Sequence, residues 1–297
     1  MTGLGALIKR DCKLFFKDKG MFITSLITPL ILLVLYATFL ANVYRDSFAS
    51  AMPQGFSVPE ALISGTVGGQ LISSLLAVSC VTVAFCTNLL MVQDKATGTR
   101  SDLTIAPVKR STLALGYFVA SAAATLIISF TALAVCLIYL SAIGWYLTVA
   151  DVLLLVLDVI LLVLFGTALS SVVNFPLSTN GQGSAVGTIV SAGYGFICGA
   201  YMPISAFADG LQKVISFLPG TYGTSLLRNH VLGGVYREMS AVGFPAEVVE
   251  GIKDSIDCNL YFFGNKVEIE AMYIILVGST LLLMGIYILM NVLSGKK

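Results

Sequence analysis

Charge is scarce in this chain. Only 11% of its 297 residues are charged and 57% are hydrophobic, which gives a mean hydropathy of +0.92. A soluble domain carries roughly 25% charged residues, because its surface needs them. The shortage excludes an ordinary soluble globular protein and predicts an integral membrane protein. The net charge of +1 also leaves no basic excess of the kind that binds nucleic acid.

Motifs for catalysis and for ATP binding are missing as well. The sequence has no GxxxxGK[ST] loop to hold phosphates and no GxSxG nucleophile motif. Its one histidine, His230, has no partner at a metal-ligand spacing such as HExxH. We therefore expect a structural histidine, no metal site and no enzyme activity. Any ATP that drives this protein must be hydrolysed by another chain.

Cysteine pairs of the CxxC type are absent too. The six cysteines are Cys12, Cys80, Cys86, Cys136, Cys198 and Cys258. Four of them lie in apolar runs, where we expect small hydrophobic side chains packed between helices. Only Cys258 lies in a segment expected outside the cell, so no structural disulfide within the chain is predicted.

Long apolar stretches dominate the remaining sequence. A membrane-spanning helix needs about 20 mainly apolar residues. Six stretches meet this requirement: 22–43, 64–92, 112–140, 151–173, 184–201 and 271–293. The sequence therefore predicts an all-α integral membrane fold with six transmembrane helices, in a single domain of residues 1–297.

The orientation of the spans follows from the basic residues in their short flanks. Basic residues are concentrated in the N-terminal segment (Lys9, Arg10, Lys13, Lys17, Lys19), in 93–110 (Lys95, Arg100, Lys109, Arg110) and at Lys296 and Lys297. The 44–63 loop has only Arg45, and the 141–150 loop has no basic residue. We therefore expect a plasma-membrane protein with both termini and 93–110 in the cytoplasm, and with 202–270 outside.

Residues 1–20 are predicted to form an amphipathic helix on the inner membrane surface. Leu4, Leu7, Ile8, Cys12 and Phe15 recur at helical spacing, with the basic residues Lys9, Arg10 and Lys13 mostly on the other side. A solvated basic leader would account for the charges but not for the apolar stripe. A cleaved signal peptide is not expected, because the apolar run that follows is too long.

The fifth span carries a ladder of small residues. Gly183, Gly187, Ser191, Gly195 and Gly199 recur at every fourth position. Small residues stacked on one helix face let a neighbouring backbone approach closely. The ladder therefore predicts a close helix contact, and it carries no information about a substrate.

Asp158 is the only acidic residue well inside a predicted span. An acid at the bilayer centre costs about 2.5–3.5 kcal/mol on insertion scales, so Asp158 should face protein or water. No intramembrane Lys, Arg or His accompanies it in the predicted spans. We favour a structural hydrogen bond to a Ser, Thr or Asn; a substrate contact and a proton-coupling site are the alternatives.

Two segments resemble a known family. DKATGTRSDLTIAPVKRSTLALG, residues 94–116, resembles the cytosolic loop of ABC-2-type permeases, and GAYMPISAFADGLQKVISFLPGTYGTSLLR, residues 199–228, is similar to the segment after their fifth span. The matching positions are Asp94, Lys95, Gly98, Thr99, Leu103, Pro107, Val108 and Arg110, then Gly199, Pro203, Pro219 and Arg228. Asp94 stands where the family usually has Glu. Residues 229–270 look more like the drug- or peptide-exporting members than the polysaccharide exporters.

The resemblance implies the transmembrane permease subunit of an ATP-driven exporter of a drug, peptide or lipid-like substrate. It implies a second permease chain, forming a homo- or heterodimer, and a separate ATP-binding subunit that holds ATP and Mg²⁺, with no cofactor in this chain. It also implies a cytosolic coupling helix in 93–110 and re-entrant helices in 202–270. The coupling residues would be Asp94, Lys95, Gly98, Thr99, Arg100, Asp102, Leu103, Pro107 and Arg110. In the re-entrant segment, Pro203 and Pro219 would interrupt helix formation, near Arg228.

The residues of 93–110 themselves suggest how this segment works. Gly98 and Pro107 are expected to bracket a short helix. Arg100 and Asp102 would face a soluble partner, while Leu103 and Ile105 would pack against protein. Three alternatives stay open: a proton- or ion-coupled secondary transporter using Asp158, a polysaccharide-exporting permease, and a membrane assembly or immunity protein that transports nothing.

Overall fold

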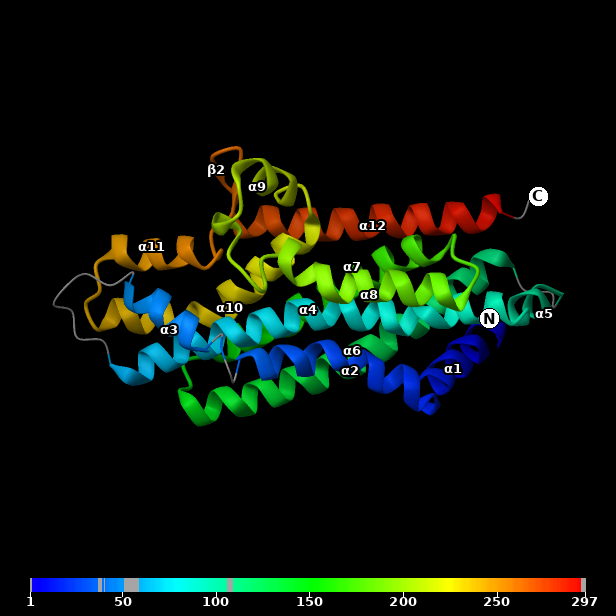
Figure 1. Ribbon diagram of the computed structural model, residues 1–297, viewed down its shortest axis with the longest axis horizontal. Helices are drawn as coiled ribbons and strands as arrows, with labels where there is room; N and C mark the ends of the chain where they lie inside the picture. Colours follow the sequence, from blue (N-terminus) through cyan, green and yellow to red (C-terminus); the bar gives the residue numbers. More distant parts are fainter. Residues whose placement is uncertain (1, 37–38, 40, 51–58, 106–108, 295–297) are drawn as a thin grey trace.

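The computed structural model describes residues 2–36, 39, 41–50, 59–105 and 109–294. These residues form an elongated bundle of helices that run side by side (Figure 1). In chain order the elements are α1 (Thr2–Lys17), α2 (Lys19–Leu35), α3 (Ala41–Ser50), α4 (Glu60–Ala96), α5 (Thr99–Ile105), α6 (Arg110–Ile143), α7 (Val149–Asn174), α8 (Asn180–Ile197), the 3-10 helix η2 (Ile204–Ala206), α9 (Asp209–Ile215), α10 (Pro219–Ala241), α11 (Ala246–Ser255), β1 (Tyr261–Phe262), β2 (Asn265–Lys266) and α12 (Ile269–Leu293). The sheet in these residues is one two-stranded hairpin, so the expected all-α class is confirmed.

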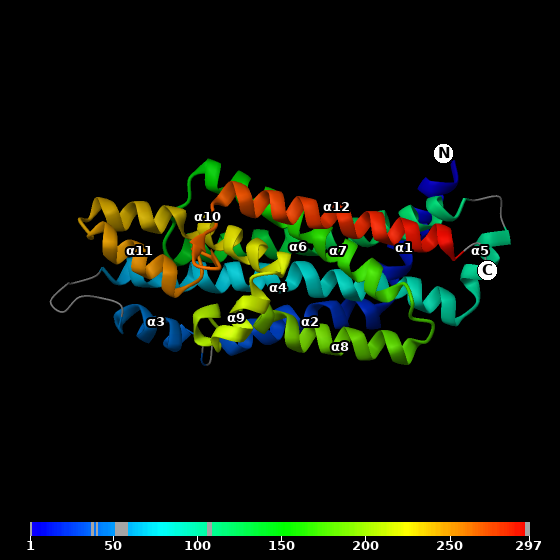
Figure 2. The same cartoon turned by 90° about the horizontal axis from the view of Figure 1, so that it is seen from above.

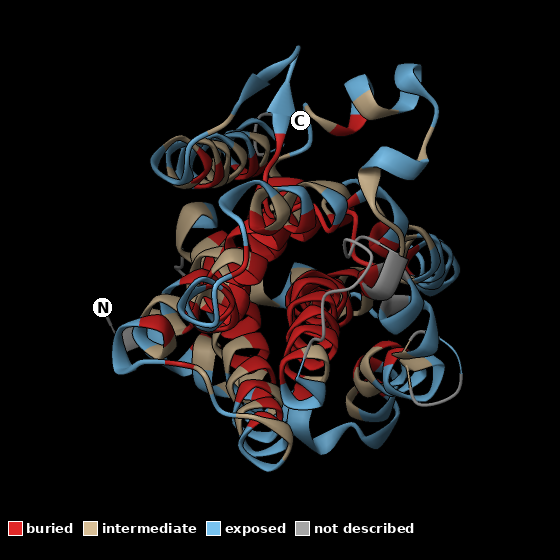
Figure 3. Ribbon diagram, turned by 90° about the vertical axis from the view of Figure 1, so that its left-hand side faces the viewer, coloured by how far each residue is buried: buried red, intermediate tan, exposed pale blue. Residues whose placement is uncertain are grey.

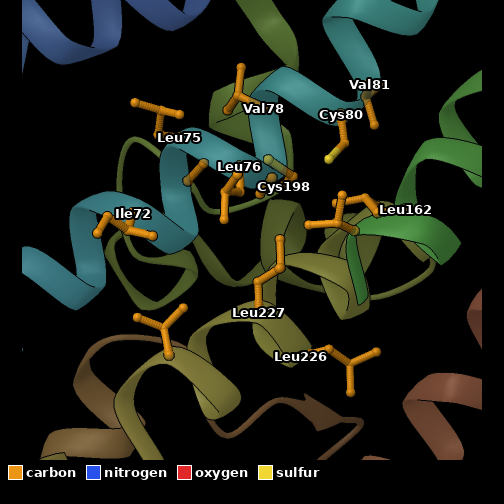
Figure 4. Close-up of a cluster of buried hydrophobic side chains, with 14 of the residues drawn as sticks. Ile72, Leu75, Leu76, Val78, Cys80, Val81, Leu162, Cys198, Leu226 and Leu227 are labelled. Carbon is orange, nitrogen blue, oxygen red and sulfur yellow. The ribbon is translucent and has the colours of Figure 1, made fainter. Parts of the chain in front are cut away.

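Helix α4 lies at the centre of the bundle (Figure 2), and Figure 3 shows the buried residues gathered towards the middle of the helices. Its 37 residues are about 55 Å long at 1.5 Å per residue, more than a hydrocarbon core of about 30 Å requires. In its most apolar stretch, 94% of the residues are buried. Helices α2, α6, α7, α8 and α10 all pack against it. Figure 4 shows the core where α4, α7 and α10 meet, with Leu76, Val81, Leu162, Leu226 and Leu227 among the side chains drawn.

Several buried polar residues of α4 form hydrogen bonds, in two different ways. The hydroxyls of Thr66 and Thr82 donate to carbonyl oxygens one turn earlier in α4 itself, at 2.8 and 2.9 Å. Asn88 instead reaches α7, where its Nδ2 donates to the hydroxyl oxygens of Ser170 (3.0 Å) and Ser171 (2.7 Å). Because no water is available in a bilayer core, such groups must be satisfied inside the protein. These bonds explain how a helix rich in hydroxyl groups can be buried.

The predicted spans agree in part with the observed helices. Those at 64–92, 112–140, 151–173 and 271–293 lie within α4, α6, α7 and α12, and these four helices are long and apolar enough to cross a membrane. Helices α1 and α2 meet the same requirement only when taken together, and they are bent by 73°. The bend turns α1 across the end of the bundle (Figure 1), so we treat α1 as lying outside the spanning part of α2. Helix α8 is not among the four, and the six-span count stays a prediction.

The two ends of the bundle differ in what they contain (Figure 1). Helices α1 and α5 and the end of α12 lie at one end, whereas α3, α11 and the end of α10 lie at the other. The described parts of both terminal segments and of 93–110 therefore lie at the same end of the bundle, and the side of the membrane that this end faces stays a prediction. All six cysteines are free, in agreement with the expected absence of a disulfide.

The 202–270 segment contains more regular helix than the sequence suggested. Pro219 is the first residue of α10, a position where the missing N–H costs nothing and the fixed φ suits a helix. The break between α9 and α10 falls directly before Pro219, as expected, and Pro219 itself begins a long helix. Helix α10 packs against α4 and α7, while α9 and the hairpin project sideways beside the start of α12 (Figure 1).

Candidate functional site

The 93–110 segment contains a short helix, as predicted. Gly98 separates α4 from α5 and has a φ of +81°. Glycine reaches this left-handed conformation easily, whereas a residue with a side chain would be strained. Gly98 therefore sets the turn between the two helices. Pro107 and Val108 lie outside the described residues.

Asp94 is buried at the end of α4 and is bound by two other helices. Arg10 of α1 donates through Nη1 to Oδ2 (2.7 Å) and through Nη2 to Oδ1 (3.0 Å). The Tyr117 hydroxyl of α6 donates to Oδ2 at 2.6 Å. Arg10 Nη1 also donates to Asp11 Oδ1 at 2.7 Å. These four residues, here called the coupling cluster, tie α1, α4 and α6 together through a bidentate ion pair, which fixes geometry as well as adding energy.

Of the two carboxylates in the coupling cluster, that of Asp11 accepts fewer hydrogen bonds than that of Asp94. Its side chain is 2% exposed, and its Oδ2 has no hydrogen-bond partner among the described residues. Removal from water disfavours the charged form and raises the pKa of Asp11 to about 6, although the nearby Arg10 opposes the shift. The pKa of an unfolded Asp is about 3.9. The folded state therefore binds a proton on Asp11 more tightly than the unfolded state does. The stabilisation that this proton provides is complete below about pH 4 and is lost as the pH rises to about 6.

We expect Asp11→Asn to raise the free energy of unfolding by on the order of 2 kcal/mol at about pH 7, and by less than half of that at about pH 4.5. The reason is that Asn never pays the cost of holding a buried charge. Thermal unfolding of the purified chain in detergent at the two pH values measures the effect. Asp102→Asn, which changes an exposed acid on α5, is the control. Equal stabilisation at both pH values would contradict the role given to ionisation.

Lys95 and Arg100 hold the turn between α7 and α8. Lys95 Nζ donates to the backbone carbonyl oxygens of Phe175 and Leu177, the second at 3.1 Å. Both cations also lie over the Phe175 ring, with Lys95 Nζ 4.8 Å and the Arg100 guanidinium carbon 5.4 Å from its centroid. Cations over an aromatic face are attracted to it. The segment is thus attached to the α7–α8 turn as well as to the coupling cluster.

The end of α12 provides a further attachment. Arg100 Nη2 donates to Asn291 Oδ1 at 3.2 Å, and Arg110 Nη1 donates to the Ser294 carbonyl oxygen at 3.0 Å. The expectation that Arg100 faces a soluble partner is therefore wrong, because its guanidinium is used within the chain. The sequence offered no signal for this contact, since Asn291 lies at the other end of the chain.

The remaining surface of α5 is open. Asp102 is exposed, as predicted, and Thr99 is half-buried. Leu103 packs against the buried cluster that includes Tyr117, also as predicted. Ile105 is 83% exposed, so its predicted packing against protein is wrong. Residues two apart on a helix point about 200° apart, so Leu103 and Ile105 cannot both face the protein.

Helix α1 uses its apolar stripe to contact the protein. Leu7 and Phe15 are buried, and the Cys12 thiol lies 3.6 Å from the Ala120 carbonyl oxygen of α6. Lys9 and Lys13 are exposed, as predicted. The expectation that this stripe lies on the membrane is therefore wrong for Phe15 and Leu7. Other apolar residues of α1, Leu14 (38% exposed) and Phe16 (39% exposed), remain uncovered.

The small-residue ladder of α8 borders a groove instead of a continuous helix contact. Gly183 approaches α4 closely, but nothing lies within 4 Å of a Cβ built on Gly187. Gly187 and Ser191 line a mainly apolar groove of about 700 Å³ between α2 and α8. Gly195 faces the Tyr201 ring of the turn that follows α8. Within the chain, the predicted close contact is therefore wrong for Gly187 and Ser191.

Arg228 is a buried anchor on α10. It is 2% exposed and donates to the Ile256 carbonyl oxygen (2.9 Å), to Asp257 Oδ2 (3.2 Å) and to the Gly199 carbonyl oxygen. Asp257 Oδ2 also accepts from the backbone N–H of Ile204 at 2.9 Å, just after Pro203, which precedes η2. A buried cation requires such partners. Arg228 thus fixes the turn after α8 and the end of α11 to α10.

Asp158 is buried between three helices. Its Oδ2 lies 2.5 Å from His230 Nδ1 of α10, and its Oδ1 accepts from the Tyr273 hydroxyl of α12 at 2.6 Å. The predicted partners Ser, Thr or Asn are therefore wrong, although the hydrogen-bonded environment agrees with the prediction. His230 was missed because α10 was expected outside the membrane. The described residues contain no group of three or more side chains that would hold a metal ion.

Comparison with known proteins gives the family. Residues 2–232 match the model of the family described as ABC-2 type transporter. No curated protein matches the chain. The matched region includes the whole coupling cluster, α5, the groove between α2 and α8, and both buried partners Asp158 and His230. The family match covers most of the chain, and its multi-pass helical architecture agrees with it: the chain belongs to the ABC-2 type transporter family, as a membrane component of an ABC transporter.

Proposed function

We propose that this chain is the permease subunit of an ATP-driven exporter in the plasma membrane, with α5 in the cytoplasm. It would pair with a second permease chain and dock on a separate ATP-binding subunit that carries ATP and Mg²⁺. The observation that supports the proposal has two parts. Helix α5 has an exposed surface, and the residues on either side of it are bonded to several other helices. A connector without a mechanical role would not need a buried ion pair, two cation–ring contacts and two bonds to the end of α12.

The attachments of the 93–110 segment suggest how movement would spread. A push on α5 from the ATP-binding subunit would reach α1 and α6 through the coupling cluster. It would reach α12 through Arg100 and Asn291, and the α7–α8 turn through Lys95. Because packed helices have few intermediate arrangements, such a push would move them as units.

The groove between α2 and α8 supports a route for an amphipathic substrate, such as a drug, peptide or lipid-like molecule. Its volume of about 700 Å³ lies within the range of small-molecule sites. Ile27, Ile31 and Phe196 line it together with the hydroxyls of Thr24 and Ser191. A second permease chain facing this groove would turn it into an enclosed path.

Purification of the chain from its native membrane tests the proposal. We expect an ATP-binding subunit with a phosphate-binding loop to copurify, and Ile105→Asp to reduce its recovery. Val149→Asp is the matched control, because Val149, the first residue of α7, is 78% exposed and lies outside the 93–110 segment. If no such subunit copurifies, and transport in vesicles proceeds without ATP, the proposal is wrong.

A secondary transporter is the second candidate, because Asp158 and His230 form an acid–base pair between helices. Transport into vesicles driven either by ATP or by an imposed proton gradient separates the two candidates. In the exporter, Asp158→Asn should retain transport, because Asn keeps a carbonyl oxygen that accepts from Tyr273. Complete loss of transport in a folded Asp158→Asn protein, together with a response to the proton gradient, would favour the second candidate.

A further inference from the structure

The β1–β2 hairpin has an unusual residue at its tip. Tyr261 pairs with Lys266 and Phe262 pairs with Asn265, which leaves Phe263 and Gly264 as a two-residue loop. Both loop residues have positive φ, 49° and 86°. Two-residue loops of this kind favour Asn-Gly, and a bulky side chain at positive φ is an outlier. The local backbone therefore gives no reason for Phe263, which points to a role for its ring.

The Phe263 ring belongs to a group of three rings on the surface. The centroid of Phe217, which follows α9, lies 5.2 Å from that of Phe262 and 6.0 Å from that of Phe263, and the latter two are 4.9 Å apart. All three contacts are edge-to-face, a favourable geometry for aromatic rings. The rings of this phenylalanine cluster nevertheless remain 63%, 36% and 61% exposed for Phe217, Phe262 and Phe263. They form an ordered apolar patch that joins α9 to the hairpin.

The base of the hairpin is held by polar contacts with α11. The Tyr261 hydroxyl donates to Asp254 Oδ1 at 3.0 Å, and Lys266 Nζ forms an ion pair with Glu250. A strained backbone conformation persists only where the surrounding structure holds it in place. These contacts hold the base of the hairpin against α11.

The phenylalanine cluster lies where the exposed surface of α12 begins. The hairpin ends at Lys266 and α12 begins at Ile269, so at most about 10 Å of chain separates them. Only 17% of the most apolar stretch of α12 is buried, and Ile274 and Leu281 are 72% and 64% exposed. Figures 1 and 3 show α9 and the hairpin projecting from the bundle. The cluster therefore lies at the start of the exposed apolar surface of α12.

We propose that the phenylalanine cluster inserts into the outer leaflet of the bilayer, at the boundary between headgroups and acyl chains, and holds α9 and the hairpin on the membrane. Apolar surface in this zone gains by burial in proportion to its area. Helix α9 adds two exposed apolar residues, Leu211 and Val214. The proposal rests on the membrane fold and the predicted orientation, and it does not require an ATP-binding partner.

A fluorescent reporter tests the contact with lipid directly. Trp145 is the single tryptophan of the chain, so Trp145→Phe with Phe263→Trp places one tryptophan at the hairpin tip. The full chain is reconstituted in phosphatidylcholine vesicles with brominated or ordinary acyl chains. We expect bromination to quench the emission by at least half and aqueous iodide to quench it little. Quenching by iodide alone would show a tip in water, and resistance to both quenchers would show a tip covered by protein; either result overturns the proposal.

A second variant separates membrane contact from folding of the hairpin. Phe263→Asn creates the Asn-Gly pair that this turn prefers, so the hairpin should persist while the tip loses its ring. With Phe217→Trp as the reporter, again with Trp145→Phe, we expect Phe263→Asn to reduce quenching by brominated lipid at least twofold. Phe39→Asn is the matched control, because Phe39 is also 61% exposed but lies in the groove beside α2. Undiminished quenching in the Phe263→Asn protein would show that the cluster does not hold α9 on the bilayer.

Discussion

In the proposed exporter, Asp94→Asn is expected to reduce transport roughly 10- to 100-fold while the proposed ATP-binding subunit continues to hydrolyse ATP. A hydrogen-bonded charged pair contributes about 1.5–3 kcal/mol, and each 1.4 kcal/mol changes an equilibrium tenfold. Asparagine keeps the size of Asp94 and an oxygen for the Tyr117 hydroxyl, but it cannot hold Arg10 through two charge-assisted bonds. Helix α1 should therefore separate from α4 and α6, and force applied at α5 would no longer reach it.

Hydrogen exchange measures this separation independently of any substrate. The backbone amides of α1 should exchange faster in the Asp94→Asn protein, and export of a compound to which deletion of the gene sensitises the cell should fall in parallel. Asp102→Asn removes the same charge from the same segment without touching the coupling cluster, and it should leave the exchange of α1 unchanged. Protection of α1 equal to that of the unmodified protein in the Asp94→Asn variant would rule out this account.

Gly234→Ala is expected to lower the free energy of unfolding by about 3 kcal/mol, the upper part of the usual range for overpacking. A Cβ on Gly234 would lie 1.9 Å from the carbonyl oxygen of Tyr146 and 2.5 Å from its carbonyl carbon. Tyr146 lies between α6 and α7, and a backbone group cannot rotate away as a side chain can. Helix α10 would have to move away from its neighbours α4 and α7.

The adjacent glycine provides the control for this prediction. A Cβ on Gly233 would meet only Arg237 Nη1 at 3.5 Å and Asp151 Oδ1 at 3.6 Å, which are ordinary contacts. Alanine also favours a helix by about 1 kcal/mol over glycine. Gly233→Ala should therefore be neutral or stabilising. Thermal unfolding of the two variants in the same detergent compares them, and equal midpoints would contradict the close approach of α10 to Tyr146.

Features that depend on neighbouring residues could be predicted from the sequence. The turn at Gly98 and the short helix after it are of this kind, because a glycine before a short polar segment is a local signal. The partners of Asp94 could not be predicted in this way, since Arg10 lies 84 positions earlier in the chain. The same holds for Asp158, whose partner His230 is on a helix expected outside the membrane. Contacts between distant segments depend on how the helices are arranged.

Helix α1 shows why apolar periodicity alone misplaces a surface in a membrane protein. A stripe of apolar residues indicates that one face of a helix is removed from water. It does not indicate whether lipid or the protein interior covers that face. The apolar stripe predicts Phe15 at the membrane surface, but Phe15 is buried in the protein. The buried Asp11 on the same helix was the available signal, because an acid facing lipid would be costly.

The distribution of hydrogen bonds along α4 has a mechanical consequence. In the described residues of α4 and α7, the side-chain bonds that join these two helices come from Asn88, near the end that carries Asp94. Farther along, Thr66 and Thr82 are bonded within α4, so a sideways shift of α7 there breaks neither of these bonds. Sliding of α7 against α4 would therefore strain the bonds of Asn88 first, close to α5, whereas the more distant part of α7 is bonded to α10 and α12 through Asp158, His230 and Tyr273.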